Sequence, residues 1–223
     1  KQDTITAITL SADETAVEYF ILDSGNGLFT AGFRPGDTIT ISGFTGVLAN
    51  NQITTVTKVW SDGSKMQIAG TLVDDLAGES VTITSCAKTF KDIFRNGVIR
   101  VYSGTEPADA DADEGAGTLL LEITKDSGAL IPGISTNGLN FDAIVSGKLS
   151  KNTDVWSDAG LAAGTASWYR MYDNGRVTGS SSEAKRCQGR ISTSGTTFIL
   201  SSTSIKLGAT TTVDTADFTM PAN

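Results

Sequence analysis

Histidine is absent from this sequence of 223 residues, and cysteine occurs only twice. Without histidine the chain lacks the commonest general base, every Ser-His-Asp or Cys-His arrangement and the commonest transition-metal ligand. Cys86 and Cys187 form no C-x-x-C pair, so their spacing does not favour zinc-ribbon or thioredoxin chemistry. We therefore expect a protein that is not an enzyme and that holds no cofactor.

Long apolar runs and basic residues are also scarce. The longest apolar stretches, such as Thr118–Ile123, fall far short of the roughly 20 residues that cross a bilayer, so we expect no membrane span. The chain has 17 Lys and Arg residues against 25 Asp and Glu residues, which gives a formal net charge of -8. Such a field repels phosphate backbones, which argues against direct binding of nucleic acid. The sequence begins at Lys1 without an initiator Met, which indicates a processed chain or one described in part.

What the chain does contain is a series of short segments in which polar and apolar residues alternate. Residues 3–85 show this alternation in runs such as ITAITL, DTITISGF and SVTITS. Alternation places one face of a strand on a core and the other face in water. Gly, Asn and Pro at the joints, as in Arg34–Asp37, supply the backbone angles that turns need. The pattern predicts an all-β chain whose first domain, residues 1–86, is a small β-barrel or sandwich.

The remaining sequence predicts a junction followed by a second β domain. Within the junction, residues 87–96, Phe90, Ile93 and Phe94 follow helical spacing, although the segment is short enough to be a strand. Residues 97–223 return to short strands, including GVIRVYSG, GTLLLEIT and GTASWYRMYD. About eight strands over this length suit a jelly-roll or Greek-key β-sandwich.

Two parts of the sequence resemble structural proteins of tailed bacteriophages. Residues 28–85, which include GFRPGDTITISGF and SDGSKMQIAGTLVDDLAGESVTIT, resemble a small β module of tail-tube and other phage structural proteins. The segments SGTEPADADADEGAGTLLLEIT, GTASWYRMYDNGRVTG and STSIKLGATTTVDTADFTMP resemble an uncharacterised family of phage virion structural proteins. The resemblance implies an inert subunit of a tailed-phage virion that docks repeatedly onto other virion proteins.

Three roles are consistent with this resemblance. The favoured role is a head decoration or cement protein, with one domain anchored on the capsid and the other projecting. A neck or tail-tube component is an alternative, and so is a carbohydrate-binding host-recognition module of a tail fibre or adhesin. In each role the chain is expected in the virion as a homo-oligomer, with major capsid, neck or tail subunits as partners.

The two cysteines have two interpretations. Free cysteine commonly behaves as a small buried hydrophobe, and this interpretation is favoured for Cys86 and Cys187. The alternative is a disulfide between them, or from one of them to a neighbouring subunit, because virions persist outside the reducing cytosol.

One acidic segment superficially resembles a calcium loop. Asp109, Asp111 and Asp113 have the D-x-D-x-D spacing in which alternate carboxylates converge on one cation. However, Gly115 falls one place late for an EF-hand, and Leu120 stands where the closing Glu would lie. We therefore expect a solvated hairpin loop and no metal site, with these three aspartates as weak calcium candidates.

The segment SWYRMYD carries the interface candidates Trp168, Tyr169, Arg170 and Tyr172. Side chains alternate along a strand, so Trp168 and Arg170 share one face while Tyr169 and Met171 share the other. The sequence predicts that one face fills the core while the other meets a neighbouring subunit, where Trp, Tyr and Arg concentrate. A sugar-binding platform is the less favoured use of these aromatic residues.

Overall fold

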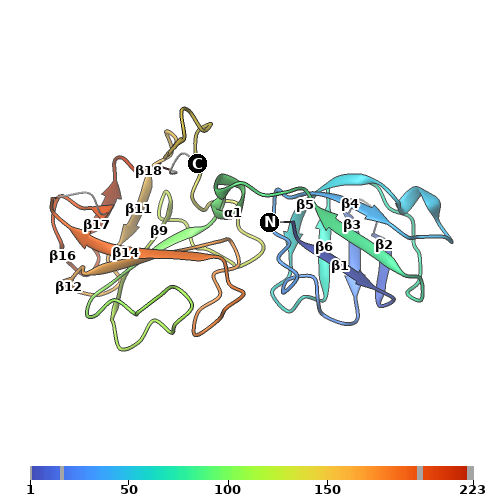
Figure 1. Ribbon diagram of the computed structural model, residues 1–223, viewed down its shortest axis with the longest axis horizontal. Coiled ribbons are helices and arrows are strands. Elements are labelled where there is room, and N and C mark those ends of the chain that lie inside the picture. Colours follow the sequence, from blue (N-terminus) through green and yellow to red (C-terminus); the bar gives the residue numbers. More distant parts are fainter. Residues whose placement is uncertain (1, 16–17, 195–197, 220–223) are drawn as a thin grey trace. The chain divides into compact units, whose positions relative to one another are not determined.

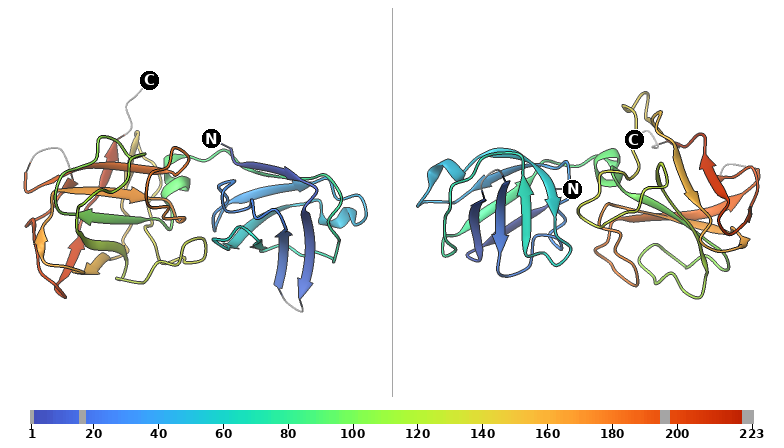
Figure 2. Two further views of the ribbon diagram at one scale, coloured as in Figure 1. Left: turned by 90° about the horizontal axis from the view of Figure 1, so that it is seen from below. Right: turned by 180° about the vertical axis from the view of Figure 1, so that it is seen from behind.

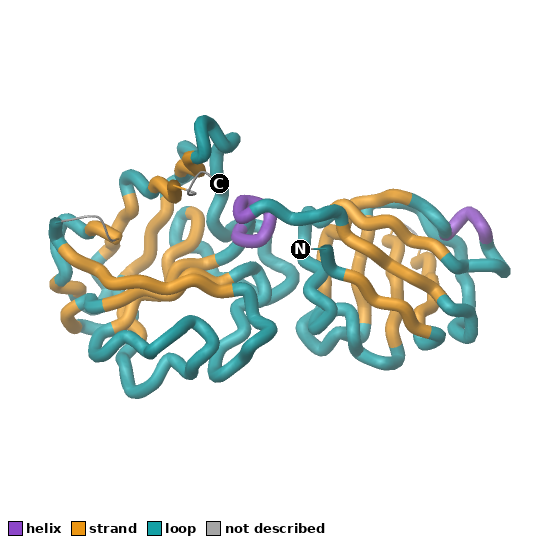
Figure 3. Tube along the Cα trace, viewed as in Figure 1, coloured by secondary structure: helices purple, strands orange, loops and turns teal. Residues whose placement is uncertain are grey.

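The computed structural model describes residues 2–15, 18–194 and 198–219, and strands make up most of its regular structure (Figures 1 and 3). The all-β class predicted from the alternation is confirmed. In the described part of the chain the only helices are α1 (Phe90–Phe94) and the short 3-10 helix η1 (Leu48–Asn50). No helix within these ranges has the length and apolar character that crossing a membrane requires.

The chain divides into two compact units. The first comprises residues 1–92 together with 131–136, and the second comprises residues 93–130 and 137–223. The division at residue 92 falls within α1 and inside the segment 87–96 that the sequence predicts as the junction. Segment 131–136 differs from the prediction, which places it in the second domain. Its assignment reflects a hydrogen bond from the Val59 N–H to the Gly133 carbonyl at 2.7 Å.

Seven antiparallel strands form the sheet of the first unit. Their order is β1-β7-β4-β5-β6-β3-β2, so the first two strands of the chain lie at opposite edges. Only Ile8 and Thr9 join these two edge strands, so the sheet must curl back on itself to bring its edges together (Figure 2). The strands are β1 (Thr4–Ala7), β2 (Leu10–Thr15), β3 (Glu18–Asp23), β4 (Thr38–Ser42), β5 (Ile53–Val59), β6 (Lys65–Ile68) and β7 (Val81–Ser85).

The core of the first unit follows the alternation of the sequence. In β4 and β7 buried and less buried residues alternate, with Ile39, Ile41, Val81 and Ile83 all at most 1% exposed. Burial of each such side chain contributes about 1.5–3 kcal/mol relative to leaving it in water. This apolar layer is the main source of stability for the curled sheet.

A buried cation ties the start of the first unit to a turn. The Nζ of Lys88 lies 2.7 Å from Asp3 and 2.6 Å from Asp37, and the side chains of all three residues are 2–6% exposed. Lys88 Nζ also donates to the Gly32 carbonyl at 3.2 Å. The ammonium is therefore fully paired, and it holds the residue before β1 against the turn before β4.

The second unit is built on another seven-stranded sheet, with the order β15-β14-β13-β8-β9-β11-β17. Two small ladders, β10 with β18 and β12 with β16, lie beside it. The strands are β8 (Val98–Tyr102), β9 (Leu119–Lys125), β10 (Lys148–Ser150), β11 (Trp156–Ala159), β12 (Gly164–Thr165), β13 (Trp168–Tyr172), β14 (Arg186–Ser192), β15 (Phe198–Ile199), β16 (Ser204–Ile205), β17 (Thr210–Val213) and β18 (Asp217–Thr219).

Candidate functional site

One face of the second unit's sheet is polar, although most of it is buried. In the register of the strands, Arg170 on β13 lies between Arg100 on β8 and Gln188 on β14. The opposite face of the same strands is apolar and includes Met171 and Ile99, both 0% exposed. Two connections cover the polar side: residues 103–118, which we call the covering loop, and residues 173–185. We call this side the polar face, and it consists of Arg100, Tyr102, Glu122, Trp168, Arg170, Tyr172, Arg186 and Gln188.

Arg170 is fully buried, and its guanidinium binds the covering loop. The Nε and Nη2 atoms both donate to Gln188 Oε1, at 3.1 and 2.6 Å. Nη1 donates to the Ala112 carbonyl at 2.9 Å, and Nη2 donates to the Asp109 carbonyl at 3.2 Å. Nη1 also lies 3.4 Å from Glu114 Oε1. Every nitrogen of the guanidinium thus has an acceptor, and the loop is anchored to the sheet at three positions.

Tyr172 and Glu114 form the second anchor of the loop. The Tyr172 hydroxyl donates to Glu114 Oε1 at 2.6 Å and lies 3.2 Å from the Tyr102 hydroxyl. Burial, and then the hydrogen bond to Glu114, raise the pKa of Tyr172 above its usual range. Burial also acts to raise the pKa of Glu114, but hydrogen bonds from Tyr172 and the Gly179 N–H hold that pKa below its usual value. The pair is therefore a neutral phenol donating to an ionised carboxylate.

Of the two faces of this strand, the one that carries Trp168, Arg170 and Tyr172 is buried within the chain, so these three interface candidates do not meet a neighbouring subunit. Each of these residues is 0% exposed. The reason is the covering loop, which follows directly after β8 and is not visible in the alternation of β13 itself. Trp168 stacks on Tyr102 with ring centroids 4.3 Å apart, which also removes it from any sugar-binding platform.

Tyr169 lies on the opposite face of β13 and is only half-buried. Its ring packs against Phe198, with centroids 4.8 Å apart, and both rings line a pocket of about 410 Å³ that Phe218 also lines. Burial raises the pKa of Tyr169 to about 12, so its hydroxyl is neutral at physiological pH. A subunit contact through Tyr169 stays a prediction.

The acidic loop uses its carboxylates for turns. Asp109 Oδ1 accepts the N–H groups of Asp111 and Ala112 at 3.0 and 2.9 Å, and Asp113 Oδ1 accepts the Gly115 N–H at 2.7 Å. Among the described residues, no group of three or more His, Cys, Asp or Glu side chains is placed to hold a metal ion. The three calcium candidates are therefore not brought together around one cation.

Both cysteines are free thiols, so the disulfide between them that the sequence allowed is not formed. Cys86 belongs to the first unit and Cys187 to the second. The alternation that buries Val81 and Ile83 in β7 turns Cys86 outward, so the prediction that it is buried is wrong. Cys187 is partly exposed on β14, and burial raises the pKa of its thiol to about 12, which disfavours the thiolate form.

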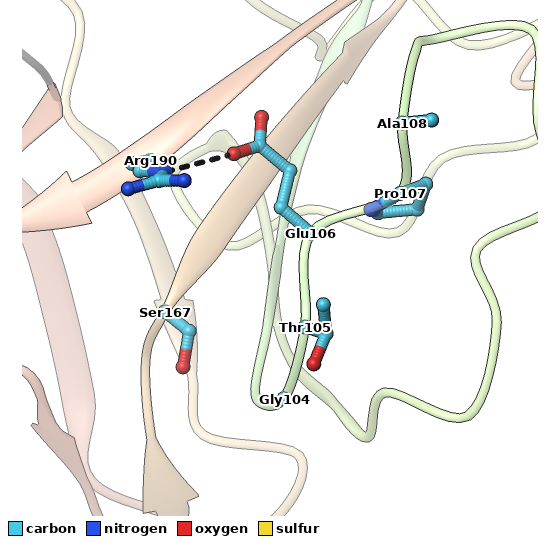
Figure 4. Close-up of a pocket in the computed structure, with 7 residues that line it drawn as sticks. All are labelled: Gly104, Thr105, Glu106, Pro107, Ala108, Ser167 and Arg190. Atoms are coloured by element: carbon cyan, nitrogen blue, oxygen red, sulfur yellow. Dashed lines mark ion pairs between the residues drawn. The ribbon is translucent and has the colours of Figure 1, made fainter.

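A pocket of about 550 Å³ opens beside the start of the covering loop (Figure 4). Arg190 Nε lies 3.4 Å from Glu106 Oε2 across this pocket, and the Arg190 side chain is 82% exposed. The Ser167 hydroxyl, also in the lining, donates to the Thr165 carbonyl at 3.4 Å. Glu106 is the only carboxylate in the lining, so the pocket lacks the carboxylate pair that glycoside hydrolysis requires. It offers polar binding groups without a nucleophile and base pair.

The first unit exposes large apolar side chains on two neighbouring loops, residues 44–52 and 70–80. Leu48 is 70% exposed, Val73 is 49% exposed and Leu76 is 85% exposed. We call these two segments the loop pair. The sequence analysis missed it because Leu48, Val73 and Leu76 stand in turn-rich segments without a period. The only signal was the presence of apolar residues where solvated turns are usually polar.

Hydrogen bonds hold the loop pair in one conformation. The Asn50 side chain donates to the Val73 carbonyl and accepts the Val73 N–H, both at 2.9 Å. Asp75 Oδ2 accepts the Val47 N–H at 3.1 Å, and Glu79 accepts from Thr45 and from the N–H of Gly46. Because both loops are fixed by these bonds, their exposed apolar side chains are presented without a large loss of conformational entropy on binding.

Comparisons of this chain with protein-family models, with curated proteins and with solved structures found no match.

Proposed function

We propose that the chain is a non-enzymatic structural subunit of a tailed-phage virion, and that it serves as a head decoration or cement protein. The observation that carries the proposal is the loop pair of the first unit, where Leu48, Val73 and Leu76 project into solvent from a fixed backbone. Exposed apolar groups rimmed by polar residues mark protein interaction sites where they form a contiguous patch. A subunit that docks onto a particle requires such a surface.

The charges around the loop pair indicate the chemistry of its partner. Asp74, Asp75 and Glu79 lie within the second loop, whereas neither loop contains Lys or Arg. Two copies of this chain that met through the same loops would bring these carboxylates together, which is unfavourable. A neighbouring protein with a basic surface and an apolar recess therefore fits better than a second copy.

The virion assignment rests on the resemblance of residues 28–85 and of the three C-terminal segments to phage structural proteins. The polar face adds support for an inert role, because its buried carboxylate and arginines anchor a loop instead of facing a cleft. Major capsid, neck or tail subunits are the proposed partners, and the virion is the proposed location.

Counting subunits on the particle tests the docking surface. In virions whose genome encodes this chain, Leu48→Ser combined with Leu76→Ser is expected to lower the bound copies at least about tenfold, since each buried Leu contributes about 1.5–3 kcal/mol. The matched control is Leu207→Ser in the second unit, because Leu207 is 70% exposed like Leu48. Unchanged occupancy of the folded double variant would refute the docking role, and cryo-electron microscopy of the particle would separate head from neck or tail.

A host-recognition module is the second candidate, and the pocket of Figure 4 favours it. Glu106, Arg190 and the hydroxyls of Thr105 and Ser167 are suited to bind a polar ligand such as a sugar. A glycan array on the intact chain tests this role. Binding that is lost in Arg190→Met would favour host recognition over decoration, and binding to no glycan would exclude it.

A further inference from the structure

Arg186 is the most unusual cation of the second unit. It begins β14, lies beside Tyr172 in the register and has a side chain that is 1% exposed. Its Nη1 donates to the Gly179 carbonyl at 2.7 Å, and its Cζ lies 5.9 Å from the centroid of the Tyr172 ring. One nitrogen of the guanidinium is thus satisfied by the connection that covers the polar face.

The other edge of the same guanidinium lacks a partner. Arg186 Nε and Nη2 are both buried, and neither has a hydrogen-bond partner among the described residues. Arg170 provides the comparison, because it lies on β13 two residues before Tyr172, the residue opposite Arg186. Its Nε and Nη2 both donate to Gln188 Oε1. The Nε–Nη2 edge therefore has a side-chain acceptor in Arg170 and has none in Arg186.

The carboxylates of the polar face do not compensate for this open edge. Glu122 is occupied by Arg100 at 2.6 Å and by Arg176 at 2.7 Å. Glu114 is occupied by Tyr172 and by the Gly179 N–H, and its Oε1 lies 3.8 Å from Arg186. Four arginines therefore share two glutamates, and the 3.8 Å contact of Arg186 is the longest of the four.

We propose that the Nε–Nη2 edge of Arg186 binds a small oxyanion, either a carboxylate or a phosphate. This edge presents two parallel N–H groups whose spacing matches the two oxygens of such an anion. A buried charged donor without an acceptor is costly, so an oxyanion that supplies two acceptors gains both charge neutralisation and hydrogen bonds. Because both nitrogens are buried, binding requires that the segments covering this edge move away from the guanidinium. This inference is independent of the proposed virion role.

Thermal unfolding of the full chain tests the proposal. Sodium phosphate and sodium acetate are titrated separately against sodium chloride at constant ionic strength. We expect at least one oxyanion to raise the melting temperature in a saturable way, because a ligand that binds only the folded state stabilises it. Arg186→Met should raise the fitted dissociation constant at least about tenfold, as expected for loss of a bidentate charge-assisted contact.

The matched control is Lys148→Met, which removes a cation of the second unit whose side chain is 50% exposed. It should leave the anion response unchanged. If Arg186→Met does not fold, Arg186→Lys keeps the charge but loses the fork, and it should show the same loss of response. In parallel, the Nε–H resonance of Arg186 in the wild-type chain should shift with the anion.

Each outcome decides the question. A response to acetate alone identifies a carboxylate ligand, and a response to phosphate alone identifies a phosphate ligand. A response to neither anion overturns the proposal. An equal response in the wild-type chain and Arg186→Met overturns it as well, because the effect would then come from ions at the surface.

Discussion

Each of the two units buries a cation, and the two cations differ in how completely acceptors surround them. In the first unit, Lys88 lies 2.7 and 2.6 Å from two carboxylates, and its charge is more than matched. In the second unit, Arg186 has two donors without an acceptor in the described part of the chain and lies 3.8 Å from Glu114. A fully paired buried charge holds a fold together, whereas an incompletely paired one leaves capacity for a ligand.

The largest effect is expected where a buried cation is completely paired and anchors a loop. Arg170→Met should lower the free energy of unfolding of the second unit by about 4–5 kcal/mol, because it leaves Gln188 and two loop carbonyls without their donor. Chemical denaturation measures the change. The control Arg190→Met should change stability by less than about 0.5 kcal/mol, since its pair with Glu106 is exposed. Similar values for both variants would contradict the anchoring role.

A smaller effect is expected for the paired cation of the first unit. Lys88→Met removes the ammonium that contacts the buried carboxylates of Asp3 and Asp37, which should cost about 3 kcal/mol. The comparison variant is Lys148→Met, whose partner Asp217 and own side chain are both 50% exposed. That change should cost at most about 1 kcal/mol. Equal losses would mean that burial does not distinguish these two ion pairs.

The incompletely paired cation, Arg186, should behave differently from both. In the absence of added oxyanion, Arg186→Met is expected to cost about 1 kcal/mol or less, because the substitution also removes two unmet donors. A loss of more than about 3 kcal/mol would show that the Nε and Nη2 groups of Arg186 are also paired in solution, and the contrast with Lys88 would then disappear. The same denaturation experiment used for Arg170→Met provides the measurement.

The smallest effect is a dependence on pH. The pKa of Glu114 is held below its usual value in the folded chain, so the carboxylate contributes stability above the usual glutamate range. This contribution should be lost as pH falls through the lower folded value. Asp158, whose pKa burial raises, acts in the opposite direction. The difference between the pH profiles of the wild-type chain and Glu114→Gln isolates the Glu114 contribution, and coinciding profiles would contradict it.

The alternation of the sequence was sufficient for the strands but not for what covers them. Ile39, Ile41, Val81 and Ile83 are buried as their spacing predicts, because in β4 and β7 a single face meets the core. In β13 residues on both faces are buried and only Tyr169 is half-buried, so alternation gave no means to decide which face offers a contact. The covering loop is separated from β13 by about fifty residues, and no local rule relates them.

The candidate site was harder to predict for the same reason. Arg170 was visible as an arginine among aromatic residues, a composition typical of interfaces. Its partners, the carbonyls of Ala112 and Asp109, are backbone groups, and the sequence does not reveal that they are acceptors. Arg186 gave no signal at all, because its open edge depends on the positions of Glu114 and Glu122, which other groups occupy.

The order of strands in the first unit has a consequence for synthesis of the chain. Thr4 in β1 pairs with Thr84 in β7, so the N-terminal strand remains without its neighbour until the ribosome has extended the chain past β7. The carbonyl of Gly133, which accepts from Val59, emerges later still. The first unit therefore completes its hydrogen bonds only after the second has begun to appear, and during that interval an exposed strand edge requires protection from pairing with other nascent chains.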